Sequence, residues 1–163
     1  MLPGLTFVLG GVGSGVAEYA ETLALGTGRS PVCILTAPSE DSVTQPGVAG
    51  RKTDWTILHA PRDIGRTLAG ISGDSAVLLS ALPAWLDTLI ADGKDPAEAE
   101  AELMAGLALC AAPVIVLSRE PALSDPPEFR TALAQLNLKL AARAGLAVHV
   151  IAGLPQVLKG SLP

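Results

Sequence analysis

The segment "FVLGGVGSGVAEYAETLA", residues 7–24, constrains the fold of this chain more than any other feature. An apolar run passes through closely spaced glycines into a helical pattern, which predicts a buried strand, a tight turn and a helix. Phosphate-binding loops have this form, with the consensus G-x-x-x-x-G-K-[ST]. Gly10 and Gly15 match the two glycines, but Val16 and Ala17 stand where the lysine and the hydroxyl belong. The segment therefore has the backbone pattern of a phosphate site without its two reactive side chains.

The rest of the chain alternates between strand and helix patterns. Several of the short apolar runs are apolar throughout, which is typical of parallel strands buried on both faces. Asp95 and Asp125 each stand before a proline and a helical pattern, so both are expected to cap helices. We therefore predict a single α/β domain over residues 1–163, a P-loop NTPase-like three-layer fold with a mainly parallel sheet. The expected strands are residues 5–9, 32–36, 55–58, 76–80, 114–118 and 147–151.

Charge and composition limit the partners. The chain has 163 residues, a net charge of −5 and no run of Lys or Arg, so we expect neither a nucleic-acid nor a membrane partner. The strongly apolar uncharged run of residues 103–118 is too short to cross a bilayer and contains Pro113. Cys33 and Cys110 lie in apolar runs and are expected to be buried free thiols. With no visible signal sequence, these features predict a cytoplasmic protein.

Three interpretations of the glycine loop are open at this point. Gly11-Val12-Gly13 begins a dinucleotide-binding G-x-G-x-x-G pattern, but Val16 occupies the third glycine position and no acid clearly ends the second strand. The glycines are also compatible with a purely structural turn between strand and helix. The third interpretation is a phosphate-binding loop that has lost its side chains.

Motifs along nearly the whole chain favour the third interpretation. They resemble, in order, those of the bifunctional adenosylcobinamide kinase / adenosylcobinamide-phosphate guanylyltransferase family of cobalamin biosynthesis. That family opens with G-G-x-x-S-G-K-S after a strand and ends with F-R-D-x-x-G-x-x-N and V-V-A-G-L-P-x-x-L-K. The matching segments here are "LGGVGSGVAEYAE", "ILTA", Trp55-Thr56 with Pro61, "VLLSALPAWL", "VIVLSRE", "FRTALAQLN" and "VIAGLPQVLKG".

The resemblance implies a nucleotide-binding loop formed by Gly10, Gly11, Val12, Gly13, Ser14, Gly15, Val16 and Ala17. The same comparison shows where the chemistry is missing. Val16 and Ala17 replace the lysine and the Mg²⁺-binding hydroxyl, Ser80 stands at the family's strand-end aspartate, and Gly47 stands at its acceptor histidine. The expected set of catalytic residues is therefore empty, and no metal ligand is predicted.

Losing all four groups removes both half-reactions, because phosphoryl transfer depends on charge stabilisation by lysine, Mg²⁺ and its ligands. The sequence predicts a catalytically inactive member of the family that acts as a binding or assembly component of the corrinoid pathway. Two alternatives stay open: an active kinase/guanylyltransferase that uses GTP or ATP with altered residues, and an unrelated interaction module. We expect no firm cofactor, only weak binding of phosphate, GTP or ATP, and no Mg²⁺ site. The expected partners are a corrinoid or a small anion, with self-association into a homo-oligomer or association with an intact family member.

Polar residues outside the glycine loop are the remaining candidates for a site. The polar stretch 37–54 is expected to be a long loop on the functional rim, with Glu40 and Asp41 as solvated charges. His59 and His149 are expected to be structural or rim residues rather than nucleophiles. Arg119-Glu120 follows a strand and is a candidate to face a ligand.

Overall fold

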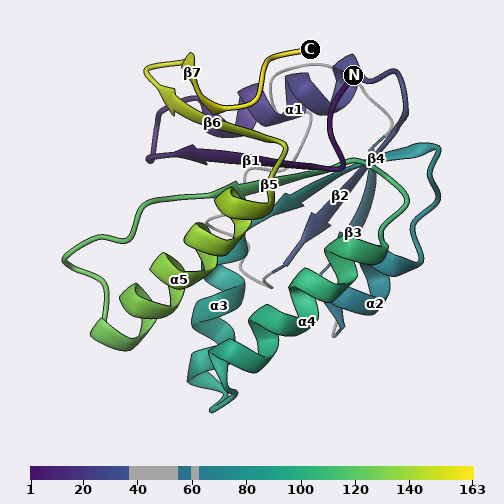
Figure 1. Cartoon of the computed structure of the whole chain (residues 1–163). Coiled ribbons are helices and arrows are strands. Elements are labelled where there is room, and N and C mark those ends of the chain that lie inside the picture. Colours follow the sequence, from purple (N-terminus) through teal and green to yellow (C-terminus); the bar gives the residue numbers. More distant parts are fainter. Residues whose placement is uncertain (37–54, 60–62) are drawn as a thin grey trace.

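A computed structural model describes residues 1–36, 55–59 and 63–163 of the chain (Figure 1). The stretch 37–54, with Glu40, Asp41 and Gly47, lies outside the described residues, so the expectations for it stay predictions. In chain order the elements are β1 (Leu5–Gly10), α1 (Val16–Gly26), β2 (Ser30–Leu35), β3 (Thr56–His59), α2 (Ile64–Ala69), β4 (Ser75–Ser80), α3 (Leu82–Ala91), α4 (Pro96–Leu109), β5 (Val114–Ser118), α5 (Pro127–Arg143), β6 (Leu146–Ile151) and β7 (Leu154–Lys159).

The strands form one seven-stranded sheet in the order β3-β2-β4-β5-β1-β6-β7. Every pairing is parallel except that of β7, which runs antiparallel to β6. Helix α1 covers one face of the sheet, and α2, α3, α4 and α5 cover the other (Figure 1). The predicted three-layer α/β fold with a mainly parallel sheet is confirmed.

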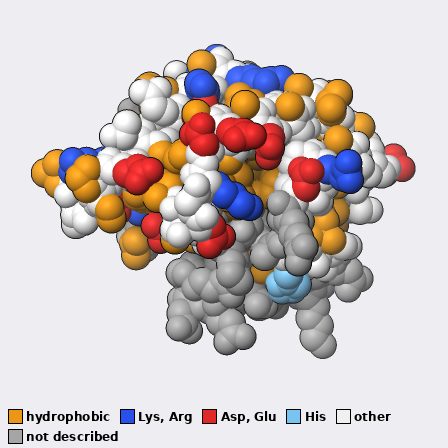
Figure 2. All heavy atoms as spheres, turned by 90° about the horizontal axis from the view of Figure 1, so that it is seen from below, with side chains coloured by type: hydrophobic (Ala, Val, Ile, Leu, Met, Phe, Trp, Pro, Cys, Tyr) orange, Lys and Arg blue, Asp and Glu red, His pale blue; other side chains and the backbone are white. Residues whose placement is uncertain are grey.

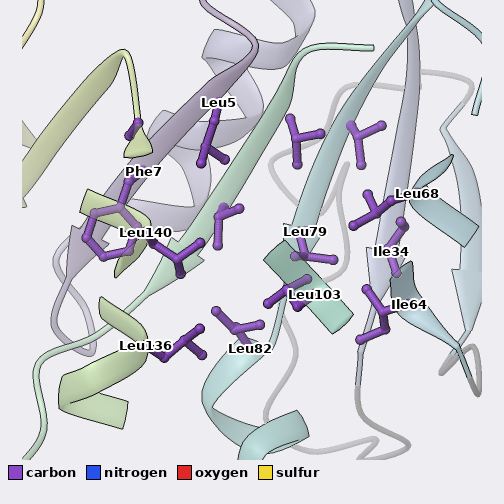
Figure 3. Close-up of a cluster of buried hydrophobic side chains, with 14 of the residues drawn as sticks. Leu5, Phe7, Ile34, Ile64, Leu68, Leu79, Leu82, Leu103, Leu136 and Leu140 are labelled. Carbon is purple, nitrogen blue, oxygen red and sulfur yellow. The ribbon is translucent and has the colours of Figure 1, made fainter. Parts of the chain in front are cut away.

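Successive side chains of β1 show how both faces are filled. Leu5, Phe7 and Leu9 pack into the larger core under α2–α5, whereas Val8 packs into the smaller core under α1. In the larger core, aliphatic side chains from the strands meet those of all four helices (Figure 3). The strand is apolar at successive positions because it is buried on both sides, as the sequence predicted.

The last strand, β7, was not expected. All of its residues are exposed, and it forms the edge of the sheet. Pro155, which has no N–H to donate, is tolerated on such an edge strand. It is joined to β6 by a turn in which Ala152 and Gly153 have φ values of 51° and 77°. The motif "AGLP" is therefore the tip of a hairpin.

The two predicted helix caps had different outcomes. Asp95 caps α4, because its carboxylate accepts a hydrogen bond from the Ala97 N–H at 3.0 Å. The prediction for Asp125 was wrong: the residue preceding α5 is Pro126, and the Asp125 carboxylate is engaged by Arg119 instead.

Both cysteines are free thiols, as predicted. Cys33 is fully buried in β2, where burial and the nearby negative charge of Glu21 raise the pKa of its thiol to about 12. Cys110, which follows α4, is only partly buried, so the prediction of a buried thiol was wrong for this residue. Within the described ranges, no helix is both long and apolar enough to pass through a membrane.

Candidate phosphate-loop site

The glycine loop leads from the carboxyl end of β1 into α1, as the sequence predicted. Gly13 and Gly15 have φ values of 73° and 82°, a region that residues with a Cβ rarely adopt, and Gly15 is the N-cap of α1. The Tyr19 N–H donates to the Gly15 carbonyl at 3.0 Å. The N–H groups of residues 16–18 precede this bond and have no acceptor inside the helix. They form the positive end of α1, beside the loop.

The loop is tightly closed around Gly10. A Cβ at this position would lie 2.6 Å from Val16 Cβ and 2.7 Å from Ser14 Oγ, so only glycine fits. Ser14 donates its N–H to the Gly11 carbonyl at 3.2 Å. Its hydroxyl is buried and has no hydrogen-bond partner among the described residues. The first residue of α1 is thus folded back over the end of β1, with the Val16 side chain against Gly10.

The β6–β7 hairpin holds the loop from the side. The Gly153 N–H donates to the Ser14 carbonyl at 2.7 Å. A Cβ on Gly15 would lie 3.3 Å from Gly153 Cα, so the two backbones are in close contact. From the sequence, "AGLP" was interpreted only as a family motif, and its contact with the loop was not predicted. The signal available in the sequence was Gly153, a turn-forming residue directly after an apolar strand pattern.

A cavity of about 860 Å³ opens beside the loop. Its walls come from the carboxyl ends of β1, β4 and β5 and from the N-terminal parts of α1, α3 and α5, which is where ligands bind in parallel α/β sheets. All eight predicted loop residues, 10–17, line it, together with Ser80 and Arg119. His59 and His149 are not among the described lining residues, and Gly47 lies outside the described part of the chain. The remaining lining residues are Glu18, Ala81, Pro83, Ala84, Asp87, Leu117, Ser118, Asp125, Pro126 and Phe129.

Ser80 offers a hydroxyl, not a carboxylate, at the end of β4. Strand β5 separates β4 from β1, so Ser80 faces the cavity from two strands away. The carbonyl of Ser80 accepts a 2.7 Å hydrogen bond from the Thr36 hydroxyl, which ties β4 to the end of β2. Ala81, with φ 61°, then turns the chain into α3.

Arg119 is the one cationic side chain among the described residues of the cavity wall. Its guanidinium makes a two-pronged ion pair with Asp125, with N–O distances of 2.9 and 3.1 Å, and lies 5.4 Å from the ring centre of Phe129. Asn137 fixes the backbone here: its side chain donates to the Arg119 carbonyl at 2.9 Å and accepts from the Ser118 hydroxyl at 2.6 Å. Of the candidate pair Arg119-Glu120, Arg119 lines the cavity and Glu120 is not among its described lining residues; that Arg119 faces a ligand stays a prediction.

The Asp125 carboxylate is held in its charged form. Hydrogen bonds from Arg119 and then from the Ala122 N–H, at 2.8 Å, lower the pKa of Asp125 below its ordinary value of 3.8. A carboxyl whose pKa is lowered on folding stabilises the folded state above its unfolded pKa, and this contribution disappears as the pH falls through the folded pKa.

We therefore expect the free energy of unfolding to fall as the pH drops below about 4, and the variant Asp125→Asn to show a flatter dependence in that range. Urea titrations between pH 2 and pH 7 measure both curves. Asp74→Asn, on an exposed turn before β4, is the matched control and should keep the parent's slope. If the free energy of unfolding decreased equally below pH 4 in the parent and in Asp125→Asn, this account of the ion pair would be contradicted.

Comparison with protein families shows to which family the chain with this loop belongs. The profile of the cobinamide kinase / cobinamide phosphate guanyltransferase family matches residues 6–158. The chain belongs to this family. The match covers β1, the loop and the β6–β7 hairpin, so the family assignment predicted from the sequence motifs is confirmed. No curated protein sequence gives a significant match.

The fold also resembles a solved structure outside this family. The crystal structure of the RadB recombinase aligns with a TM-score of 0.54 and 18% sequence identity, covering 91% of this chain and 74% of that one. At this identity the likeness concerns the fold alone. As a family member, the chain has a cobinamide-kinase-type fold whose loop carries Val16 and Ala17 where phosphoryl transfer needs a lysine and a hydroxyl.

Proposed function

We propose that this protein is a non-catalytic member of the cobinamide kinase / cobinamide phosphate guanyltransferase family that binds a corrinoid or supports assembly in the same pathway. One observation carries the proposal: the cavity beside the loop and its backbone frame are present, but Val16, Ala17 and Ser80 stand in place of the lysine, the Mg²⁺-binding hydroxyl and the acid. Arg119 does not replace the lysine, because its guanidinium is already paired with Asp125.

Binding of cobinamide tests this function. We expect equilibrium dialysis, followed by the visible absorption of the corrinoid, to show saturable binding without nucleotide. Ala84→Phe, which fills the cavity wall, should weaken it at least about tenfold, the fold-change that corresponds to 1.4 kcal/mol. Ala101→Phe adds the same side chain on an exposed position of α4 and should leave binding unchanged. Absence of saturable binding, or equal binding by both variants, would contradict the proposal.

The proposal also includes where the protein acts and whether it associates with other chains. The two free thiols and the low basic content support a cytoplasmic protein. The exposed edge strand β7, with Leu154 and Leu158 71% and 58% exposed, supports self-association or association with an intact family member. Light scattering of the purified protein measures the first, and a monomer at all concentrations would exclude a homo-oligomer.

A further inference from the structure

We propose that the cavity beside the glycine loop selects a ligand without negative charge that has an apolar body and carbonyl or hydroxyl oxygens, and discriminates against nucleoside triphosphates. This inference rests on the proposed non-catalytic function and names the ligand chemistry of the same site. It reverses the preference expected of a nucleotide-binding loop.

The charges around the cavity are the first support. Three carboxylates, Glu18, Asp87 and Asp125, face it against one guanidinium, Arg119, which leaves a formal charge of −2 on the described wall. Residues 37–54 and 60–62, which lie outside the described part of the chain, contain three basic and three acidic residues and therefore carry no formal net charge. On the face of the molecule shown in Figure 2, acidic and basic side chains both stand among apolar ones, so the negative balance belongs to the cavity wall and not to that whole face. A triphosphate would therefore enter a site of its own sign.

The pairing within the wall strengthens this conclusion. Both oxygens of Asp125 bind Arg119, so the positive charge is compensated inside the protein and held against Phe129. Glu18 and Asp87 are exposed side chains on the first turn of α1 and on α3. Glu18 in addition offsets the positive end of the α1 dipole, which would otherwise attract phosphate.

Backbone N–H donors and apolar walls indicate which ligands suit the cavity once negatively charged ones are excluded. The N–H groups of residues 16–18 need acceptor atoms, which a neutral carbonyl or hydroxyl oxygen supplies without adding charge. Val12, Pro83, Leu117 and Phe129 offer apolar surface around them. At about 860 Å³ the cavity is of the size that holds a whole small molecule, not a lone phosphate.

A nucleoside series separates charge from shape. Guanosine, GMP and GTP share base and sugar and differ in negative charge, so calorimetry without Mg²⁺ at about 50 mM salt compares them directly. We expect the affinity to fall along this series, with GTP at least about tenfold weaker than guanosine, the ratio that corresponds to 1.4 kcal/mol. The double variant Glu18→Gln/Asp87→Asn should reduce the difference in affinity between guanosine and GTP, because both negative charges are removed from the wall. The control variant Glu102→Gln/Asp74→Asn changes the net charge by the same amount outside the cavity. It should leave the difference in affinity between guanosine and GTP unchanged.

Binding of GTP as tight as that of guanosine, or tighter, would overturn this inference, and so would no binding of guanosine at millimolar concentration. The proposed function fails on a different result, namely transfer of a phosphoryl or guanylyl group to cobinamide. Tight GTP binding without transfer would therefore refute the ligand class and leave the non-catalytic function standing.

Discussion

The double variant Val16→Lys/Ala17→Ser is expected to bind Mg²⁺–GTP at least about tenfold more tightly than the parent, a gain of 1.4 kcal/mol or more. The backbone frame is in place: Gly13 and Gly15 have the required positive φ values, and the first turn of α1 presents its N–H groups. A lysine at position 16 adds a charge for the β- and γ-phosphates, and a serine at position 17 adds a hydroxyl for Mg²⁺. Space at position 16 is suitable, because a lysine stem can pack against Gly10 as Val16 does.

Calorimetry with GTP and ATP measures this gain. Thr22→Lys, on an exposed position of α1 away from the cavity, adds the same charge elsewhere and should give no gain. Catalysis should stay absent in the double variant, since Ser80 and Gly47 still lack the acid and the histidine. Unchanged affinity in the double variant would mean that the loop does not take up the phosphate-binding conformation.

Gly106→Ala is expected to destabilise the fold by about 2–3 kcal/mol, because overpacking at a rigid contact has no room to relax. Gly106 lies in α4 where it crosses α2, and an added Cβ would stand 2.4 Å from Gly65 Cα and 2.7 Å from the Gly65 carbonyl oxygen. Both obstructing atoms belong to the backbone, so the helices must separate. For a chain of this length the midpoint of thermal unfolding should fall by roughly 5–10 °C.

A matched glycine provides the control. Gly26 is also helical, at the end of α1, and an added Cβ there meets no atom within 4 Å. Gly26→Ala should be neutral or slightly stabilising, since alanine restricts the unfolded chain. Circular dichroism melts of both variants decide the point. Equal melting temperatures for Gly106→Ala and Gly26→Ala would contradict the close crossing of α2 and α4.

Local patterns predicted the parts of the fold that depend on local physics. The apolar run of β1, the glycines and the helical repeat of α1 are contiguous, so the strand, the turn and the helix start at Val16 could be located from the sequence. The strands β4 and β5 were recognised for the same reason, because burial on both faces leaves a continuous apolar run.

The features that escaped prediction depend on distant partners. Strand β7 is exposed along its whole length, so it leaves no burial pattern, and it exists because β6 offers an edge. The Gly153–Ser14 hydrogen bond joins the two ends of the chain. Asp125 has the sequence of a helix cap, but the guanidinium of Arg119 competes for its carboxylate, and a charged donor makes the stronger bond. The negative wall of the cavity likewise appears only when Glu18, Asp87 and Asp125 are brought together.

Transfer of label from GTP or ATP to cobinamide tests the central claim most directly. The parent protein is incubated with Mg²⁺, cobinamide and nucleotide labelled at the γ-phosphate, and in parallel with cobinamide phosphate and GTP labelled at the α-phosphate. Because the lysine, the hydroxyl, the strand-end acid and the acceptor histidine are all replaced, we predict no product above a blank without protein in either reaction. Formation of labelled product by the parent, lost in Gly15→Val, where a side chain would be strained at φ 82°, would contradict the account.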